Sequence, residues 1–106
     1  MGYYTAYEID VLKPNEVDEE EICKYLESLD LPDFGKWHGG WCAYGKWYEH
    51  EDDLKKLSLL FPDVVFRVYG DGEESDDIWY KYFKNGKVQY CPCHFSFDPY
   101  DEAKLE

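Results

Sequence analysis

A chain of 106 residues, 44% hydrophobic and 20% aromatic, is long enough for one folded domain and too rich in aromatic side chains to be a disordered acidic tail. Its 24 acidic residues outnumber its 11 Lys and Arg, and the formal charge of −13 disfavours direct binding to nucleic acid or to an anionic membrane. Because the sequence has neither a membrane-length apolar run nor a secretory leader, we expect a cytoplasmic protein with four reduced cysteines.

The N-terminal half predicts a strand, a helix and an irregular segment. Residues 3–12 alternate between two faces and are rich in aromatic and β-branched types, which is typical of a strand. Asp18 is the expected N-cap of a helix over residues 18–29, whose first turn carries glutamates that the helix dipole favours. Residues 30–48 mix glycines with aromatic side chains and indicate a short, irregular strand or hairpin.

The C-terminal half predicts a second helix, which Pro62 ends, and then three strands. An acidic loop over residues 70–77 follows the first of these strands, and Asn85-Gly86 is a strong hairpin signal between the other two. The expected spans are 50–61 for the helix and 64–69, 78–84 and 87–97 for the strands.

The order β-α-(β)-α-β-β-β predicts a single α+β domain over residues 1–106. Two helices of this kind pack most economically on one face of an antiparallel sheet of four to five strands, as in a ferredoxin-like or related sandwich.

The segment 91–94, Cys-Pro-Cys-His, has the residue types of a zinc site, but one residue separates its cysteines where structural zinc sites use two to four. On the predicted strand, Cys91 and Cys93 share one face with Phe95 and Phe97. We therefore interpret these four residues as core positions, with zinc as the alternative. No metal and no cofactor is expected.

Two clusters of carboxylates could form a Ca²⁺ site or a catalytic acid–base pair, and each has a simpler interpretation. The loop over residues 70–77 holds five acids but lacks the ligand spacing of an EF-hand, so a solvated or protein-facing acidic patch is favoured over Ca²⁺. Asp52 and Asp53 begin the second helix, where the dipole explains them better than acid–base catalysis does. With no nucleophile motif in the sequence, we do not expect an enzyme.

Aromatic residues leave two interpretations open. They can stack on a base or enclose a small ligand, or they can thicken the core of a small sheet. The candidate pocket residues are Trp37, Trp41, Trp47 and Trp79.

Several segments resemble a family of small phage and prophage proteins of unassigned function. They read MGYYT at the N-terminus, then KWYEHEDDL, FPDV, GDGEE, DIW and KYFKNGK between residues 46 and 87, followed by Gln89. The helix, Phe-Pro-Asp and strand are more distantly similar to the ferredoxin-like domain of YubB-type phage and plasmid proteins. The resemblance covers the N-terminal strand and residues from 46 onward, and residues 13–45 depart from it. It implies a fold and a bacterial host but no catalytic residues.

A small, acidic, phage-type protein without a catalytic motif favours a counter-defence inhibitor of the anti-CRISPR or anti-restriction type. Its carboxylates would take the place of phosphates in the basic channel of a host protein that handles nucleic acid. One alternative is an aromatic pocket that sequesters a nucleotide-like immune signal, and another is a phage regulatory or accessory protein acting as a homodimer. The predicted partner-binding residues are Glu19, Glu20, Glu27, Asp71, Glu73, Glu74, Asp76 and Asp77.

Overall fold

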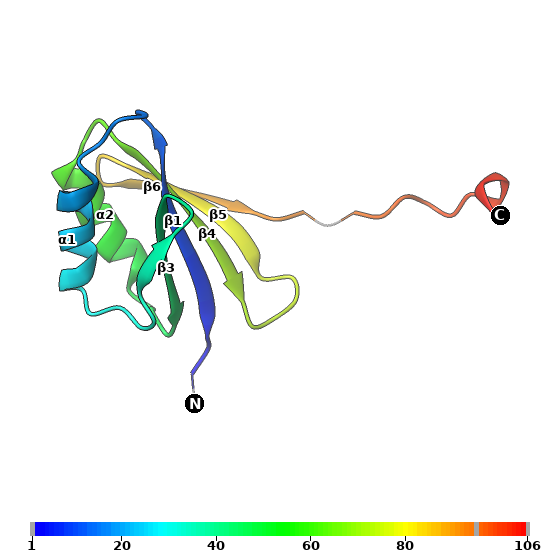
Figure 1. Ribbon diagram of the computed structural model, residues 1–106. Coiled ribbons are helices and arrows are strands. Elements are labelled where there is room, and N and C mark those ends of the chain that lie inside the picture. The colour runs from blue at the N-terminus through cyan, green and yellow to red at the C-terminus, as the bar shows by residue number, and fades with distance from the viewer. Residues whose placement is uncertain (1, 95, 106) are drawn as a thin grey trace.

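A six-stranded antiparallel sheet with two helices on one face forms the protein in a computed structural model that describes residues 2–94 and 96–105 (Figure 1). The α+β class, both helices and their place on one face are as the sequence predicts. The elements are β1 (Thr5–Lys13), α1 (Glu19–Ser28), β2 (Gly35–Trp37), β3 (Gly40–Gly45), α2 (His50–Leu60), β4 (Val65–Gly72), β5 (Ile78–Lys84), β6 (Lys87–Pro92) and a short 3₁₀ helix (Glu102–Lys104).

The strand order is β2-β3-β1-β4-β5-β6, so β1 lies inside the sheet between β3 and β4. Each helix connects two strands that have a third strand between them: α1 joins β1 to β2 across β3, and α2 joins β3 to β4 across β1. The β5–β6 hairpin then extends the sheet beyond β4. Asn85 and Gly86 both have positive φ in its turn, which confirms the predicted hairpin signal.

The sheet has six strands where four to five were expected, because the irregular segment forms a complete hairpin of its own. Trp37 pairs with Gly40, and the two residues between them, His38 and Gly39, have φ angles of 45° and 82°. Positive φ at both turn positions matches the twist of a tight two-residue hairpin. Since β2 has only three residues, its alternation is too short to read from the sequence.

The core lies between the helices and the sheet and is built from alternate strand positions. Ile22 and Leu26 on α1, and Leu54 and Leu57 on α2, are fully buried one helical turn apart. They cover the side chains that the strands turn toward the helices, which are Tyr7, Ile9, Trp41, Ala43, Phe66, Val68, Trp79 and Phe83.

The predicted helix boundaries agree with the structure to within one residue. Asp18 is the N-cap of α1, and its carboxylate accepts a hydrogen bond from the backbone N–H of Glu21 at 3.1 Å. α2 ends at Leu60, two residues before Pro62.

The strand predicted over residues 87–97 ends at Pro92. The prediction that Cys91, Cys93 and Phe97 lie in the core is wrong. Cys91 is only half-buried, Cys93 is exposed, and Phe97 is 92% exposed. Phe95 lies outside the described residues. Proline has no N–H to donate and does not favour continuation of a strand ladder, and Cys93 makes the last hydrogen bond of the hairpin, to Ile78 O at 2.9 Å.

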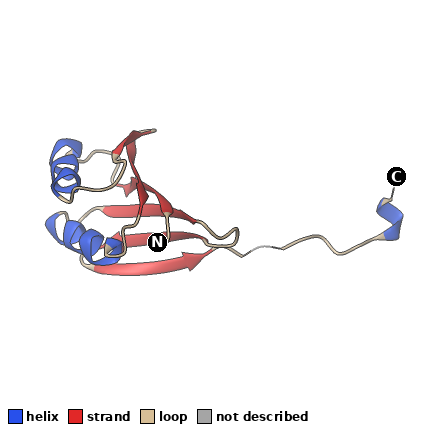
Figure 2. Cartoon of the chain, turned by 90° about the horizontal axis from the view of Figure 1, so that it is seen from below, coloured by secondary structure: helices blue, strands red, loops and turns tan. Residues whose placement is uncertain are grey.

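Residues 96–105 lie away from the domain as an extended tail (Figures 1 and 2). The radius of gyration is 16.7 Å, compared with about 13 Å for a compact domain of this length.

Replacing Gly70 by alanine should lower the free energy of unfolding by about 1–3 kcal/mol, because a Cβ there would overlap the Trp79 indole on β5. Gly35→Ala is the matched control, since a Cβ at Gly35 meets nothing within 4 Å. Urea unfolding followed by tryptophan fluorescence checks both variants. Equal stabilities would mean that the Gly70–Trp79 contact does not constrain the sheet.

Candidate functional site

The acidic side chains predicted to bind a partner lie in two regions, and the larger one is on α1. Residues 16–33 contain eight acids and one lysine, Lys24, which makes an exposed ion pair with Glu21 at 3.3 Å. Glu19, Glu20 and Glu27 are all exposed. Because Ile22 and Leu26 point into the core, Glu20 and Glu27 project from the opposite side of the helix. We call residues 16–33 the α1 acidic surface.

The second acidic region is the β4–β5 turn, where Asp71, Glu73, Glu74 and Asp76 are exposed and Asp77 is half-buried. Tyr3 ties this turn to the N-terminal strand: its hydroxyl donates to Asp77 Oδ2 at 2.7 Å and accepts from the Glu74 N–H at 3.1 Å. The hydrogen bond to Asp77 raises the pKa of Tyr3. In the described ranges, no three His, Cys, Asp or Glu side chains are grouped to hold a metal ion.

These two acidic regions are far apart. In Figure 1, α1 lies on one side of the molecule, whereas the β4–β5 turn is at the other end of the sheet. The structure therefore does not join the eight residues predicted for partner binding into one continuous surface.

The four tryptophans predicted as a pocket are also not gathered in one place. Trp41 is in the core at 1% exposure, and Trp37 lies on the edge strand β2 at 50% exposure. Only Trp47 and Trp79 are close, with the Tyr7 ring at 5.2 Å from the first and 6.2 Å from the second. Both of these indoles are buried, which favours the core interpretation for Trp41, Trp47 and Trp79.

A buried lysine lies beside this aromatic pair. Lys81 points from β5 to the helix side of the sheet, and its Nζ is 4.4 Å from the Trp79 ring centroid. The Nζ is also 2.7 Å from Glu51 Oε2 and 2.7 Å from His50 Nε2, both at the start of α2. Sequence reasoning did not select this network as a site. The alternation of β5, which puts Lys81 in phase with Trp79 and Phe83, was the signal available.

The hydrogen bonds assign the His50 tautomer. Its Nδ1 lies 3.0 Å from the carbonyl oxygen of Trp47, which can only accept, so Nδ1 carries the proton and Nε2 accepts from Lys81. Burial, and then the charge of Lys81, lower the pKa of His50 and keep it neutral. The hydrogen bond from Lys81 lowers the pKa of Glu51.

Adjacent to this network is a cavity of about 190 Å³, lined by the Tyr3, Tyr48 and His50 side chains among others. Its one lysine is already neutralised by Glu51 at 2.7 Å. His50 Nε2 is occupied by Lys81 and is not free to take a proton from a substrate. The arrangement orders the start of α2 against β5 and has no unpaired cation for a phosphate.

In the described part of the chain, no helix covers the second face of the sheet, which carries a row of tyrosines. Arg67 donates to both carboxylate oxygens of Asp10, at 3.2 and 2.8 Å, and its guanidinium is 5.5 Å from the Tyr80 ring centroid. The Tyr80 ring in turn packs against those of Tyr69 and Tyr82, with ring centroids 5.4 and 6.2 Å apart. Tyr80 is 41% exposed, so this face of β5 presents aromatic side chains to solvent.

Comparison with known proteins identifies no family. No family model matches the chain, and neither the curated proteins nor the solved structures give a significant match. Within residues 2–94 and 96–105, neither α-helix has the length and apolar character needed to cross a membrane.

Protonation of His50 should make stability depend on pH. In the unfolded chain this imidazole takes a proton near pH 6.5, whereas the folded protein resists it, so the stabilisation is complete above pH 6.5 and is lost as the pH falls toward the lowered pKa. We expect the free energy of unfolding to fall less between pH 7.5 and 5.5 in His50→Gln than in the wild type. Urea unfolding at both pH values measures this difference.

His38→Gln is the control, because His38 is exposed on the β2–β3 turn. It should retain the wild-type dependence on pH. If His50→Gln also retained it, the neutral His50 would not be the origin of the effect.

Proposed function

We propose that this protein is a non-enzymatic, phage-type counter-defence inhibitor that binds a basic, nucleic-acid-handling host protein through the α1 acidic surface. The observation that carries the proposal is the concentration of eight exposed or loop-borne acids with one lysine along residues 16–33. A surface of this kind attracts a basic groove at long range, and it repels nucleic acid itself.

Helix energetics support a role for these charges beyond stability. Glu19, Glu20 and Glu21 lie in the first turn of α1, where the helix dipole favours negative charge. Glu27 lies at the other end of the helix, where the dipole disfavours it, and the last turn has no basic residue. Asp30 follows the C-cap residue Leu29 directly and adds to this cost. Stability of the helix alone therefore does not account for the acids of its C-terminal end.

Two other candidate binding sites, the tryptophan pocket and the β4–β5 turn, have less support. A pocket for a nucleotide-like signal would need neighbouring tryptophans and an unpaired cation, yet Trp37 and Trp41 are remote from Trp79, and Glu51 neutralises Lys81. The β4–β5 turn is a smaller acidic region, and Asp77 in it serves as an acceptor for Tyr3.

For the fold, we propose a ferredoxin-like sandwich extended by a hairpin. The strands β2-β3-β1-β4 with helices after β1 and β3 make two interleaved β-α-β units, which is the arrangement expected of that fold. The β5–β6 hairpin would be an addition at the β4 edge.

The test of function starts from the full chain coupled to beads and incubated in a lysate of a bacterial host. Bound proteins are eluted in steps of NaCl and identified by mass spectrometry. We expect a protein with a basic nucleic-acid channel, released as salt rises, because the screening length falls from about 8 Å at 0.15 M to about 3 Å at 1 M. The chain should also displace a labelled oligonucleotide from that protein in a fluorescence anisotropy assay.

Neutralising α1 should weaken this displacement. The triple variant Glu19→Gln, Glu20→Gln, Glu27→Gln is expected to raise the inhibitory concentration about tenfold, since exposed ion pairs contribute about 0.2–1 kcal/mol each and steer association.

The matched control removes the same charge from the β4–β5 turn, by Glu73→Gln, Glu74→Gln and Asp76→Asn. It should leave the inhibitory concentration close to the wild-type value. An equal rise of the inhibitory concentration in the two triple variants would count against α1 as the contact surface. An inhibitory concentration that neither triple variant changes would count against phosphate mimicry.

A further inference from the structure

The extended tail carries uncovered aromatic side chains together with acids. Phe97 and Tyr100 are 92% and 76% exposed, and Leu105 is 65% exposed. Asp98, Asp101 and Glu102 lie among them, and Asp101 caps the short 3₁₀ helix by accepting from the Ala103 N–H at 3.1 Å. These apolar side chains are not covered by their own domain and are therefore free to contact another surface.

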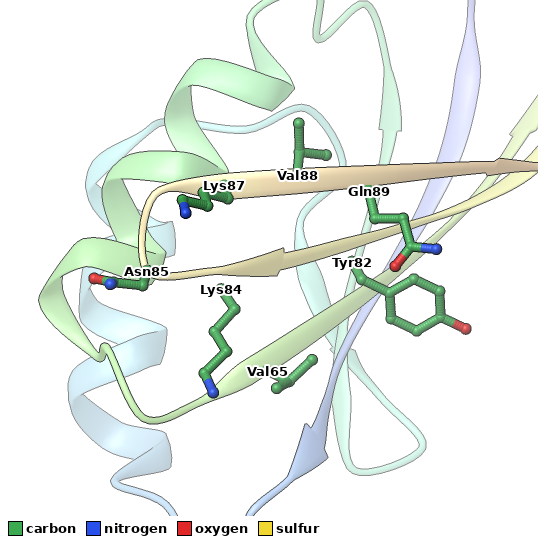
Figure 3. Close-up of a pocket in the computed structure, with 7 residues that line it drawn as sticks. All are labelled: Val65, Tyr82, Lys84, Asn85, Lys87, Val88 and Gln89. Carbon is green, nitrogen blue, oxygen red and sulfur yellow. The ribbon is translucent and has the colours of Figure 1, made fainter.

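A cavity with the complementary character lies at the β5–β6 turn. It has a volume of about 430 Å³, and Val65, Tyr82 and Gln89 line it together with two lysines, Lys84 and Lys87 (Figure 3). Figure 3 shows Lys84 extending from β5 toward Val65, with Tyr82 and Gln89 side by side farther along the strands. Its lining residues include no acid.

The two lysines are directly opposite each other in the β5–β6 ladder. Like charges in that position destabilise a hairpin unless an anion lies close to both. Among the ion pairs of the described residues, neither lysine has an acidic partner. The cavity therefore favours a ligand that combines an aromatic group with carboxylates.

The tail of a second copy can reach this cavity by a simple symmetric arrangement. β6 is the last strand of the sheet, so one of its edges has no partner strand in the described part of the chain. If two β6 strands pair antiparallel about a two-fold axis, the Pro92 end of each lies beside the Lys87 end of the other. The tail of each copy then starts beside the β5–β6 turn that holds the partner's Lys84–Lys87 cavity.

We propose that two copies of this chain form a dimer in which each tail, residues 96–105, docks its Phe97 and Tyr100 side chains and its acids in the Lys84–Lys87 cavity of the other copy. The occupant is a second copy because its tail combines exposed aromatic groups with carboxylates, which the cavity lacks and which match Lys84 and Lys87 in charge. The charge complementarity is local, within a chain whose overall charge is −13. This dimer does not depend on the inhibitor proposed above.

Sedimentation equilibrium of the full chain over the micromolar range tests the dimer. Lys84→Glu with Lys87→Glu should raise the dimer dissociation constant at least about tenfold, and Phe97→Ala with Tyr100→Ala should do the same. Lys55→Glu with Lys56→Glu makes the same change of charge on α2 and should leave the constant near the wild-type value. Circular dichroism of each variant verifies that it is folded.

The decisive variant reverses the charge both of the cavity lysines and of the tail acids. Adding Asp98→Lys, Asp101→Lys and Glu102→Lys to the Lys84→Glu, Lys87→Glu chain should restore the dimer, because the charges again match in opposite sense. A wild-type chain that stays monomeric up to 100 micromolar would overturn the proposal. So would a dimer that the lysine and tail substitutions leave unchanged, since that dimer would use another surface.

Discussion

The structure depends on the burial of one face of a single sheet under two short helices. Every fully buried large side chain comes from alternate strand positions or from a helical stripe, so the domain has one core. Because burying an unpaired carboxylate is costly, none of the described acids lies in that core, and they are left on α1, the start of α2, the strand turns, the open face of the sheet and the tail. The distribution of charge on the surface therefore follows from where the core is.

Lys81 is the exception that shows what the core tolerates. Its side chain is 10% exposed and lies along the Trp79 ring, so its apolar stem packs while its ammonium group meets an acid and a neutral imidazole. Glu51 and His50 come from the first turn of α2, which means that the lysine also positions this helix on the sheet.

Local patterns predicted the features that depend on neighbouring residues. The helical stripes, the Asp18 cap, and the Asn85-Gly86 turn were all readable from the sequence, because each depends on spacings of a few residues. The end of β6 was not, since Cys91 and Cys93 alternate in the same way whether or not a core lies against them. The network of Lys81 with His50 was missed because it joins residues 31 positions apart, and the separation of the two acidic regions is likewise a matter of tertiary arrangement.

The position of β1 inside the sheet has a consequence for how the chain folds. β1 is made first, but the strands that flank it, β3 and β4, end only at residues 45 and 72. During synthesis its apolar side chains therefore have no sheet to join until most of the domain has left the ribosome. Contacts between such distant segments make folding slow relative to helical proteins of equal size. We expect the domain to form late and in a single cooperative step.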